Sequence, residues 1–231
     1  MVIILKENHT FDNYFGTFPG ANGARLPRSP NPPARDHPHT HAAWLARQTT
    51  AAREQFVEQD IPAYFSYARK FCLCDNYYTD VAGPSTPNHL MLLCADSPII
   101  DNPSRRTPQT IKIVRGGLWP DVAVFLTWDD WGGWYDHVEP PAAEVWHANG
   151  AHPRYMGSQF RYGPRVGCIV LGPYARNGYI SKVLHSHVSL LKFCEVNFGL
   201  ATLNPRDARA DDMSDCFDFG KRPATLPPAV P

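Results

Sequence analysis

The chain has 231 residues, enough for one domain with a buried core and too few for two comfortable ones. Its 22 Lys and Arg balance 22 Asp and Glu, so it lacks the broad positive field on which dedicated nucleic-acid binders rely. With 43% hydrophobic and 12% aromatic residues, the composition is globular and excludes both a fully disordered chain and a coiled coil. No apolar run approaches the roughly 18 residues that span a bilayer. We expect no membrane span, and either a cytosolic protein or one that lacks its leader.

Patterns typical of strands and helices alternate along the chain, which predicts an α/β fold built on a layered sheet. Asp60 is expected to cap one helix and Thr86 to cap the next, with Pro87 in the first helical position. We expect one domain over residues 1–220 and a mobile tail over 221–231. The predicted elements, in order, are a strand at 2–5, helices at 42–55, 61–72 and 86–95, strands at 121–128 and 165–172, and a helix at 187–198.

Polar side chains follow two of the predicted strands directly. Glu7 and Asn8 offer hard oxygen ligands for a divalent cation, although a plain strand-to-turn junction explains an isolated pair of this kind equally well. Asp129 and Asp130 are adjacent carboxylates that repel each other unless a cation or a proton lies between them. Solvated acids in a turn are the alternative. Because open α/β sheets keep their ligand sites at the carboxyl ends of strands, these four residues are candidate metal ligands.

Ser85 is expected at the entrance of a helix, where unpaired backbone amides and the positive end of the helix dipole favour a phosphate or a developing alkoxide. A nucleophile would belong there. The simpler interpretation is a turn or cap serine within the segment GPSTP. No G-x-S-x-G pattern surrounds Ser85, so a metal would have to activate it.

Histidines and cysteines give weaker signals. His37, His39 and His41 alternate in a loop, where they are able to bind zinc or hold a substrate oxyanion, but a single histidine is more often a packed or surface residue. The six cysteines form neither a dense disulfide framework nor paired C-x-x-C motifs. We interpret them as mostly buried thiols. Further candidate histidines are His137, His185 and His187.

Four segments, in this order, resemble the bacterial phosphoesterase family of non-hemolytic phospholipases C and acid phosphatases. They are ENHTFDNYFGTFPG, DNYYTDVAGPSTPNHL, FLTWDDWGGWYDHVEPP and VLGPYARNGYISKVLHSHVSLLKF. The resemblance implies the alkaline-phosphatase-like superfamily, whose fold is a three-layer sandwich with a mainly parallel central sheet between helices.

The same resemblance implies one divalent metal ion and a serine nucleophile. The position of Ser85, directly after Gly83 and Pro84, makes it the nucleophile in preference to Thr86. An all-oxygen ligand set favours Ca²⁺, Mg²⁺ or Mn²⁺. The implied mechanism is in-line attack of the Ser85 hydroxyl on phosphorus, followed by hydrolysis of the phosphoserine. By motif position, the metal ligands are Glu7, Asn8, Ser85, Asp129 and Asp130.

Two histidines and one amide complete the implied site. Asn8 would stabilise the equatorial phosphate oxygens, and His39, preferred over His41, and His187 would orient the phosphate or protonate the leaving group. The chain departs from the family pattern at His89, which stands where relatives usually carry Arg. It also has only the short stretch 101–119 where relatives carry a much longer segment.

The predicted function is therefore metal-dependent hydrolysis of phosphate monoesters or diesters, as in an acid phosphatase or a phospholipase C. The expected partners are a small phosphate ester or a phospholipid head group, and no nucleic acid. The shortened middle segment leaves a second hypothesis open, a non-catalytic relative that binds phosphate or metal. A third is a sulfuryl or phosphonate hydrolase of the same superfamily. Relatives are often exported, but the localisation stays open.

Overall fold

A computed structural model describes residues 1–97, 99–103, 122–142 and 162–221. None of the helices in these ranges combines the length and the apolar character needed to cross a bilayer. The expected tail at 221–231 lies almost wholly outside the described residues. The elements are β1 Val2–Lys6, α1 Phe11–Phe15, α2 His41–Leu45, α3 Arg47–Thr50, α4 Pro62–Lys70, β2 Cys72–Cys74, β3 Tyr77–Tyr78, α5 Ser85–Cys94, β4 Val124–Trp128, β5 Cys168–Leu171, β6 Tyr179–Ser181, β7 His185–Ser186, α6 His187–Phe198, α7 Pro205–Arg209 and the 3₁₀ helix η4 Ser214–Cys216.

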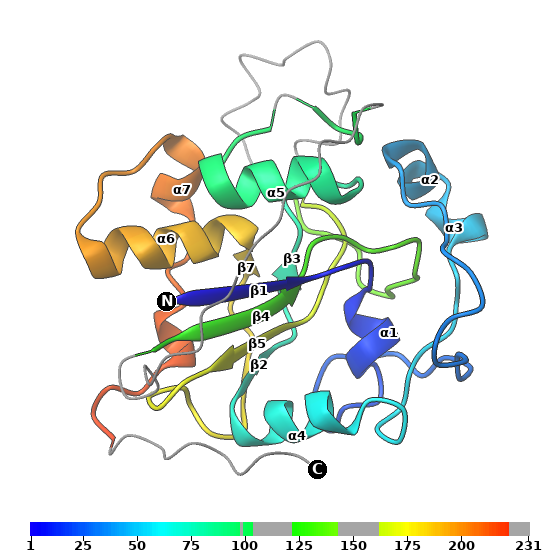
Figure 1. Ribbon diagram of the computed structural model, residues 1–231, viewed down its shortest axis with the longest axis horizontal. Helices are drawn as coiled ribbons and strands as arrows, with labels where there is room; N and C mark the ends of the chain where they lie inside the picture. Colours follow the sequence, from blue (N-terminus) through cyan, green and yellow to red (C-terminus); the bar gives the residue numbers. More distant parts are fainter. Residues whose placement is uncertain (98, 104–121, 143–161, 222–231) are drawn as a thin grey trace.

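The central sheet has the strand order β1-β4-β5-β2-β6 (Figure 1). β1 pairs with β4 in parallel, and β2 pairs with β6 in parallel. Only β5 runs antiparallel to both of its neighbours, β4 and β2, so the described part of the sheet is mainly parallel. A small second sheet pairs β3 with β7 in parallel. The predicted α/β class and the mainly parallel sheet are confirmed.

Helices pack on both faces of this sheet, because successive side chains of a strand point to opposite faces. On one face Phe125 of β4 meets Phe193 of α6, with ring centroids 4.9 Å apart. On the other face Trp128 of β4 contacts Phe15 of α1 and Tyr64 of α4. These aromatic contacts give three layers, with α6 and the helix α4 on opposite faces (Figure 1).

Several predicted helix boundaries are wrong. The helix expected at 42–55 is two short helices, α2 and α3, and the one expected at 61–72 ends at Lys70, so that Cys72 lies in β2. Asp60 does not cap α4: its carboxylate binds Arg28 and accepts the amide of Val57. The helix after the Gly-Pro turn begins at Ser85, with Pro84 as its N-cap, and not at Thr86. Local contacts outside each helix decided these ends.

One buried guanidinium, that of Arg165, joins four segments that are far apart in the sequence. Its Nη2 lies 3.2 Å from Asp12 Oδ1 in α1 and 3.2 Å from Asp136 Oδ2 in the loop after β4. Its Nη1 donates to the carbonyl oxygens of Asn22 and of Asp75, which follows β2. The side chains of Arg165 and Asp12 have no solvent exposure. The loops around the end of β4 are therefore fixed by one charge network.

A second buried acid, Asp80, connects the segment after β3 to α6. Its Oδ2 accepts the backbone amide of Val188 at 3.2 Å. Burial raises the pKa of Asp80 to about 6, although the nearby Arg206 guanidinium acts in the opposite direction. The folded state therefore holds this proton more tightly than the unfolded state does.

We expect Arg165→Met to lower the free energy of unfolding by about 3 to 5 kcal/mol, because it leaves two buried carboxylates without their cation. Arg28→Met is the control, because Arg28 pairs with Asp60 through a side chain that is 62% exposed, and it should have a much smaller effect. Urea denaturation of the three proteins measures both values. Equal effects of the two substitutions would contradict the structural role of Arg165.

The pKa of Asp80 predicts a pH dependence of stability. An unfolded carboxyl titrates at about 3.8, so between about pH 4 and pH 6 the unfolded state releases this proton first and stability falls as pH rises. Relative to Asp80→Asn, the wild-type free energy of unfolding should fall by about 3 kcal/mol across that interval and stay level above it. Denaturation curves at several pH values test this. Parallel pH profiles of the two proteins would show that Asp80 is not the group responsible.

Candidate active site

The residues at the carboxyl ends of β1 and β4 meet at one edge of the sheet. Because the two strands are parallel neighbours, Glu7 and Asn8 after β1 come to lie beside Asp129 and Asp130 after β4. The amide of Asn8 donates to Asp129 Oδ1 at 3.0 Å, which fixes one pair against the other. Sequence reasoning placed these four residues at strand ends, and the structure brings them together.

Asn8 takes an unusual backbone conformation, which places the acids close to it. Its φ of 61° lies in the left-handed region, which asparagine tolerates better than most residues. The chain after Asp130 passes so near that a Cβ added at Gly132 would lie 2.1 Å from the carbonyl oxygen of Asn8. Gly132 itself has a φ of 58°. Only glycine fits this approach, which explains the Gly-Gly turn after the two acids.

Ser85 is presented by a turn that Asn88 holds together. The side-chain oxygen of Asn88 accepts the amide of Val81, and its Nδ2 donates to the carbonyl oxygens of Val81 and Pro84. Asn88 is completely buried, whereas Ser85 is only partly buried. The ten-residue helix α5 thus begins with a hydroxyl that solvent can reach.

The Ser85 hydroxyl faces the acids of the two strand ends. Its Oγ lies 3.1 Å from Asp130 Oδ2 and 3.4 Å from Glu7 Oε2. Asp129 and Asp130 have no solvent exposure, while Glu7 is exposed. Solvent therefore reaches the site at Ser85 and at Glu7, whereas the two aspartates are shielded from solvent.

The two aspartates differ in their electrostatics. Burial and the negative charge of Asp129 hold the pKa of Asp130 well above its usual range. Burial also pushes the pKa of Asp129 upward, but contacts from His89 and from the Asn8 amide outweigh it and leave this pKa below its usual value. Asp130 therefore holds its proton more tightly than Asp129 does.

The negative charge of Asp129 raises the pKa values of both Glu7 and His89. Partial burial and the charge of Asp129 raise the pKa of Glu7. The contact with Asp129 raises the pKa of His89, against the effect of burial. The site thus concentrates three carboxyl groups and draws positive charge towards them.

Three buried polar atoms at this site have no hydrogen-bond partner among the described residues: Asn8 Oδ1, Asp129 Oδ2 and His89 Nε2. The last two lie 3.5 Å apart as a long ion pair. Ligand atoms of Glu7, His89 and Asp129 lie within 4.8 Å of one another. Buried polar groups are normally satisfied. Unsatisfied oxygens beside clustered acids fit a divalent cation, with His89 as an added nitrogen ligand.

His89 was not among the predicted site residues. A usable signal was present, because residues four apart on a helix share a face and Ser85 and His89 have that spacing in α5. The sequence analysis noted His89 only as a departure from the family pattern. Its nearness to Asp129 depends on how α5 lies against the end of β4.

His187 is completely buried and touches the site through the backbone. Its Nε2 lies 3.0 Å from the carbonyl oxygen of Asp129, and its Nδ1 lies 2.9 Å from the hydroxyl of Tyr77. A carbonyl only accepts, so Nε2 carries the proton and Nδ1 accepts from Tyr77. Burial lowers the pKa of His187 to about 4. His187 is thus neutral at pH 7 and holds the end of β4 in place.

No hydrogen bond in the described ranges joins the side chains of His37, His39 or His41 to Ser85. The Nδ1 of His39 lies 2.7 Å from the carbonyl oxygen of His37, and no hydrogen bond in the described ranges joins the His39 ring to the acids. The Nδ1 of His41 lies 2.7 Å from the carbonyl oxygen of Ala82, close to the turn before Ser85. A catalytic role for His39 stays a prediction.

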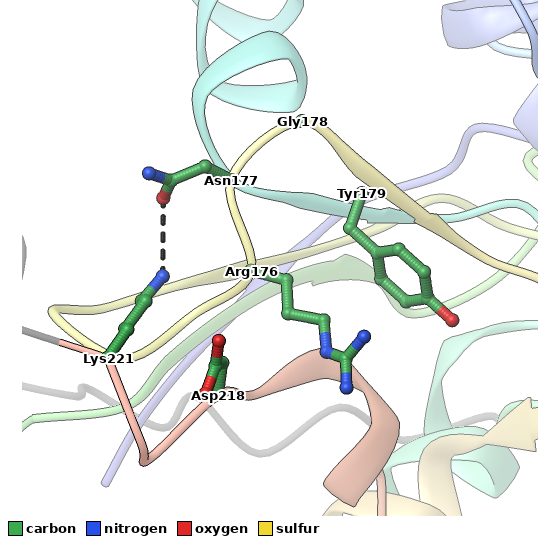
Figure 2. Close-up of a pocket in the computed structure, with 6 residues that line it drawn as sticks. All are labelled: Arg176, Asn177, Gly178, Tyr179, Asp218 and Lys221. Carbon is green, nitrogen blue, oxygen red and sulfur yellow. Dashed lines mark hydrogen bonds between the residues drawn. The ribbon is translucent and has the colours of Figure 1, made fainter.

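Two other polar features lie outside this site. The group Asp12, Asp136 and His137 has the spacing of metal ligands, but Arg165 already supplies the positive charge between its acids. A cavity of about 390 Å³ lies beside the turn between β5 and β6 (Figure 2). Its two cations, Arg176 and Lys221, already donate to backbone carbonyl oxygens. Neither feature includes Ser85.

The sequence has recognisable relatives. It is 28% identical over 123 residues to the non-hemolytic phospholipase C of Pseudomonas aeruginosa. The aligned region covers 44% of this chain and 18% of the relative. It is 30% identical over 139 residues to phospholipase C A of Mycobacterium tuberculosis, covering 53% of this chain and 26% of the relative. The hemolytic phospholipase C of Pseudomonas aeruginosa is 24% identical over 196 residues, covering 80% of this chain and 24% of the relative.

The chain therefore spans between 18% and 26% of the length of these relatives. The model of the Phosphoesterase family matches residues 37–116 and 109–201, well over half of the chain. The matched regions contain Ser85, Asp129 and Asp130, the hydroxyl and the two buried acids described above. The resemblance seen in the four sequence segments is confirmed: the chain belongs to the Phosphoesterase family.

Proposed function

We propose that the chain hydrolyses phosphate esters in a divalent-metal-dependent reaction with Ser85 as the nucleophile. The observation that supports this most is the position of the Ser85 Oγ, 3.1 Å from Asp130 Oδ2 at the start of α5. A partly exposed hydroxyl that faces two buried acids, one of which has an unsatisfied oxygen, is suited to attack a phosphorus atom held there.

The proposal includes a metal centre held by Glu7, Asn8, Ser85, Asp129 and Asp130, with His89 as a sixth group. The chemistry that a bound divalent ion supplies at such a site is a lowered pKa of the attacking hydroxyl and neutralisation of the phosphate oxygens. Support comes from the unpartnered Asn8 Oδ1 and Asp129 Oδ2. The oxygen-rich ligand set favours Mg²⁺, Ca²⁺ or Mn²⁺.

The chain's own residues account for the remaining steps. Asp130 accepts a hydrogen bond from the Ser85 hydroxyl and orients its Oγ for in-line attack. The Ser85 oxygen forms a bond to phosphorus while the bond between phosphorus and the alcohol oxygen breaks, and the proton of the Ser85 hydroxyl leaves with the alcohol. Water then attacks the phosphoserine, the bond between phosphorus and the Ser85 oxygen breaks, and one proton of that water passes to Ser85 as the phosphate departs.

We divide the histidines by their placement. His187 is a positioning residue, because it holds the backbone carbonyl of Asp129 and both of its ring nitrogens are occupied. His89 lies beside Asp129 and Glu7, where an imidazole is able to complete the metal site or contact the phosphate. His39 is retained, on the family resemblance alone, as the histidine predicted to orient the phosphate or to protonate the leaving group.

Phospholipid head groups and small phosphate monoesters are the substrate classes that we propose. The named relatives are phospholipases C, which favours the phosphodiester of a phospholipid as the substrate. The acid phosphatase alternative and the alkaline-phosphatase-like superfamily are proposals too. The three layers and the mainly parallel sheet support the superfamily assignment.

A second candidate function is binding of phosphate or metal without turnover. It is favoured by the fact that, of the described histidines, only His89 lies within 4.0 Å of a carboxylate oxygen beside Ser85. The leaving alcohol then has few proton donors.

The experiment is hydrolysis of p-nitrophenyl phosphate and p-nitrophenylphosphorylcholine by the purified chain, with Mg²⁺, Ca²⁺ or Mn²⁺ and without metal. Ser85→Ala should lower kcat/KM by at least about 10³-fold, because the nucleophile is lost. Thr86→Ala is the matched control, since it removes the neighbouring hydroxyl of the same helix turn and should keep activity. Full activity of Ser85→Ala would contradict the mechanism.

Asp129→Asn should abolish both activity and the rise in melting temperature that the activating ion produces, because the buried acid is part of the metal site. Asp96→Asn, an exposed acid just after α5, should retain both. A wild-type chain that binds phosphate and metal tightly but turns over neither ester would support the binding function instead. If the chain hydrolysed p-nitrophenyl sulfate or a phosphonate ester faster than the two phosphate esters, it would be a sulfuryl or phosphonate hydrolase instead.

A further inference from the structure

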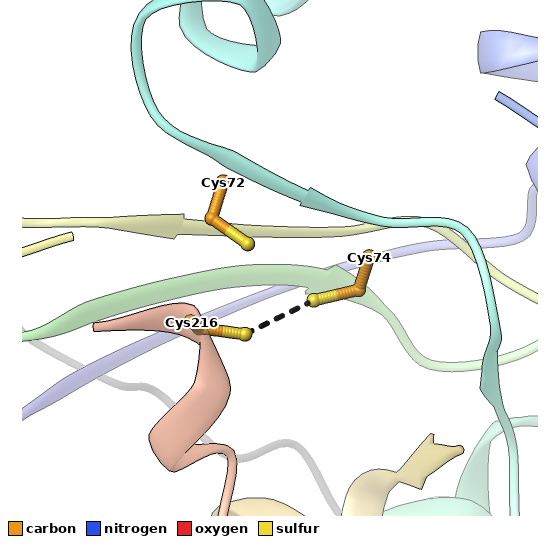
Figure 3. A group of neighbouring side chains, drawn as sticks. All are labelled: Cys72, Cys74 and Cys216. Carbon is orange, nitrogen blue, oxygen red and sulfur yellow. Dashed lines mark hydrogen bonds between the residues drawn. The ribbon is translucent and has the colours of Figure 1, made fainter. Parts of the chain in front are cut away.

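Three thiols meet in the core, on the face of the sheet that η4 covers (Figure 3). Cys72 and Cys74 are two residues apart in β2, so both side chains point to the same face. Cys216 comes from η4, and its Sγ lies 3.7 Å from that of Cys74. All three residues have no solvent exposure. The fold thus brings together sulfurs that are up to 144 positions apart in the sequence.

The separations match those of thiolates on one metal ion. The sulfurs of Cys72, Cys74 and Cys216 lie within 4.8 Å of one another. A tetrahedral ion with Zn–S bonds of about 2.3 Å holds its sulfurs about 3.8 Å apart. The 3.7 Å between Cys74 and Cys216 agrees with this value and is far longer than a disulfide bond of about 2.05 Å.

Polar groups surround Cys216 where an apolar core would have none. His185 Nε2 lies 4.0 Å and Asp215 Oδ1 lies 3.5 Å from its Sγ. The other ring nitrogen of His185, Nδ1, lies 2.8 Å from Asp211 Oδ1. At zinc sites a carboxylate commonly accepts from the second ring nitrogen of a histidine ligand, and Asp211 has this position relative to His185. Cys216 Sγ, His185 and Asp215 form a second group with metal-ligand spacing, and it shares Cys216 with the three thiols.

We propose that Cys72, Cys74 and Cys216 bind one zinc-class ion through their thiolates, at a structural site that shares no residue with the Ser85 site. Thiolates select borderline and soft ions such as Zn²⁺, whereas the oxygen ligands near Ser85 select hard ions. Each thiol releases its proton to solvent when the ion binds. The ion would fasten η4, near the end of the described chain, to β2, an inner strand of the sheet.

The first test uses the wild-type chain purified under reducing conditions and loaded with Zn²⁺. X-ray absorption at the zinc edge should give three sulfur neighbours at about 2.3 Å. A first shell of only oxygen and nitrogen would overturn the proposal. So would a chain two hydrogens lighter than expected, with the peptides of Cys74 and Cys216 cross-linked, because that result identifies a disulfide.

The second test is titration with Cd²⁺, followed by thiolate-to-cadmium absorption in the ultraviolet. The wild type should bind one ion per chain with this signature, and Cys74→Ser and Cys216→Ser should lose it. Cys94→Ser, which removes an exposed thiol, should keep it, as should the double variant Glu7→Gln with Asp129→Asn. Absence of the signature in the wild type, or its loss in the double variant, would overturn the proposal.

Discussion

The buried guanidinium of Arg165 sits between the carboxylates of Asp12 and Asp136 and donates to the backbone after β2. Asp12 lies in the first turn of α1, the helix that follows Glu7 and Asn8, and Asp136 lies in the loop that follows Asp129 and Asp130. A single charge therefore holds together the two loops that carry the acids of the candidate active site. Since removal of a buried partner leaves the remaining charges uncompensated, the loops have little freedom to separate.

The Arg165 network also opposes the electrostatic repulsion between the acids of the candidate active site. Asp129 and Asp130 are buried side by side, and the pKa of Asp130 rises well above its usual range because burial and Asp129 both oppose its ionisation. The loop after β1 carries Glu7 and the loop after β4 carries Asp129 and Asp130, so repulsion among the three carboxyl groups favours separation of the two loops. The loops stay together because Arg165 binds both of them and His187 holds the backbone carbonyl of Asp129.

The same sheet carries two chemically different groups of side chains that could hold a metal ion. Carboxyl groups gather where β1 and β4 end, while the sulfurs of Cys72, Cys74 and Cys216 lie together at one face of β2. The first set is partly open to solvent and contains the Ser85 hydroxyl, as a reaction requires. The second set is sealed in the core and contains only thiols, which suits a structural role.

The sequence by itself determined the local patterns: β1, β4 and β5 from apolar β-branched runs, α6 ending at Gly199, and Glu7, Asn8, Asp129 and Asp130 at strand ends. These follow from side-chain periodicity and turn chemistry, which act over a few residues. It also marked Ser85 through the family motif. Only the tertiary structure decided that His89 joins the acids, that His187 contacts the backbone of Asp129, and that Arg165 and Cys216 reach partners more than a hundred residues away. Such contacts depend on how helices and loops pack across the sheet, and no local pattern encodes that packing.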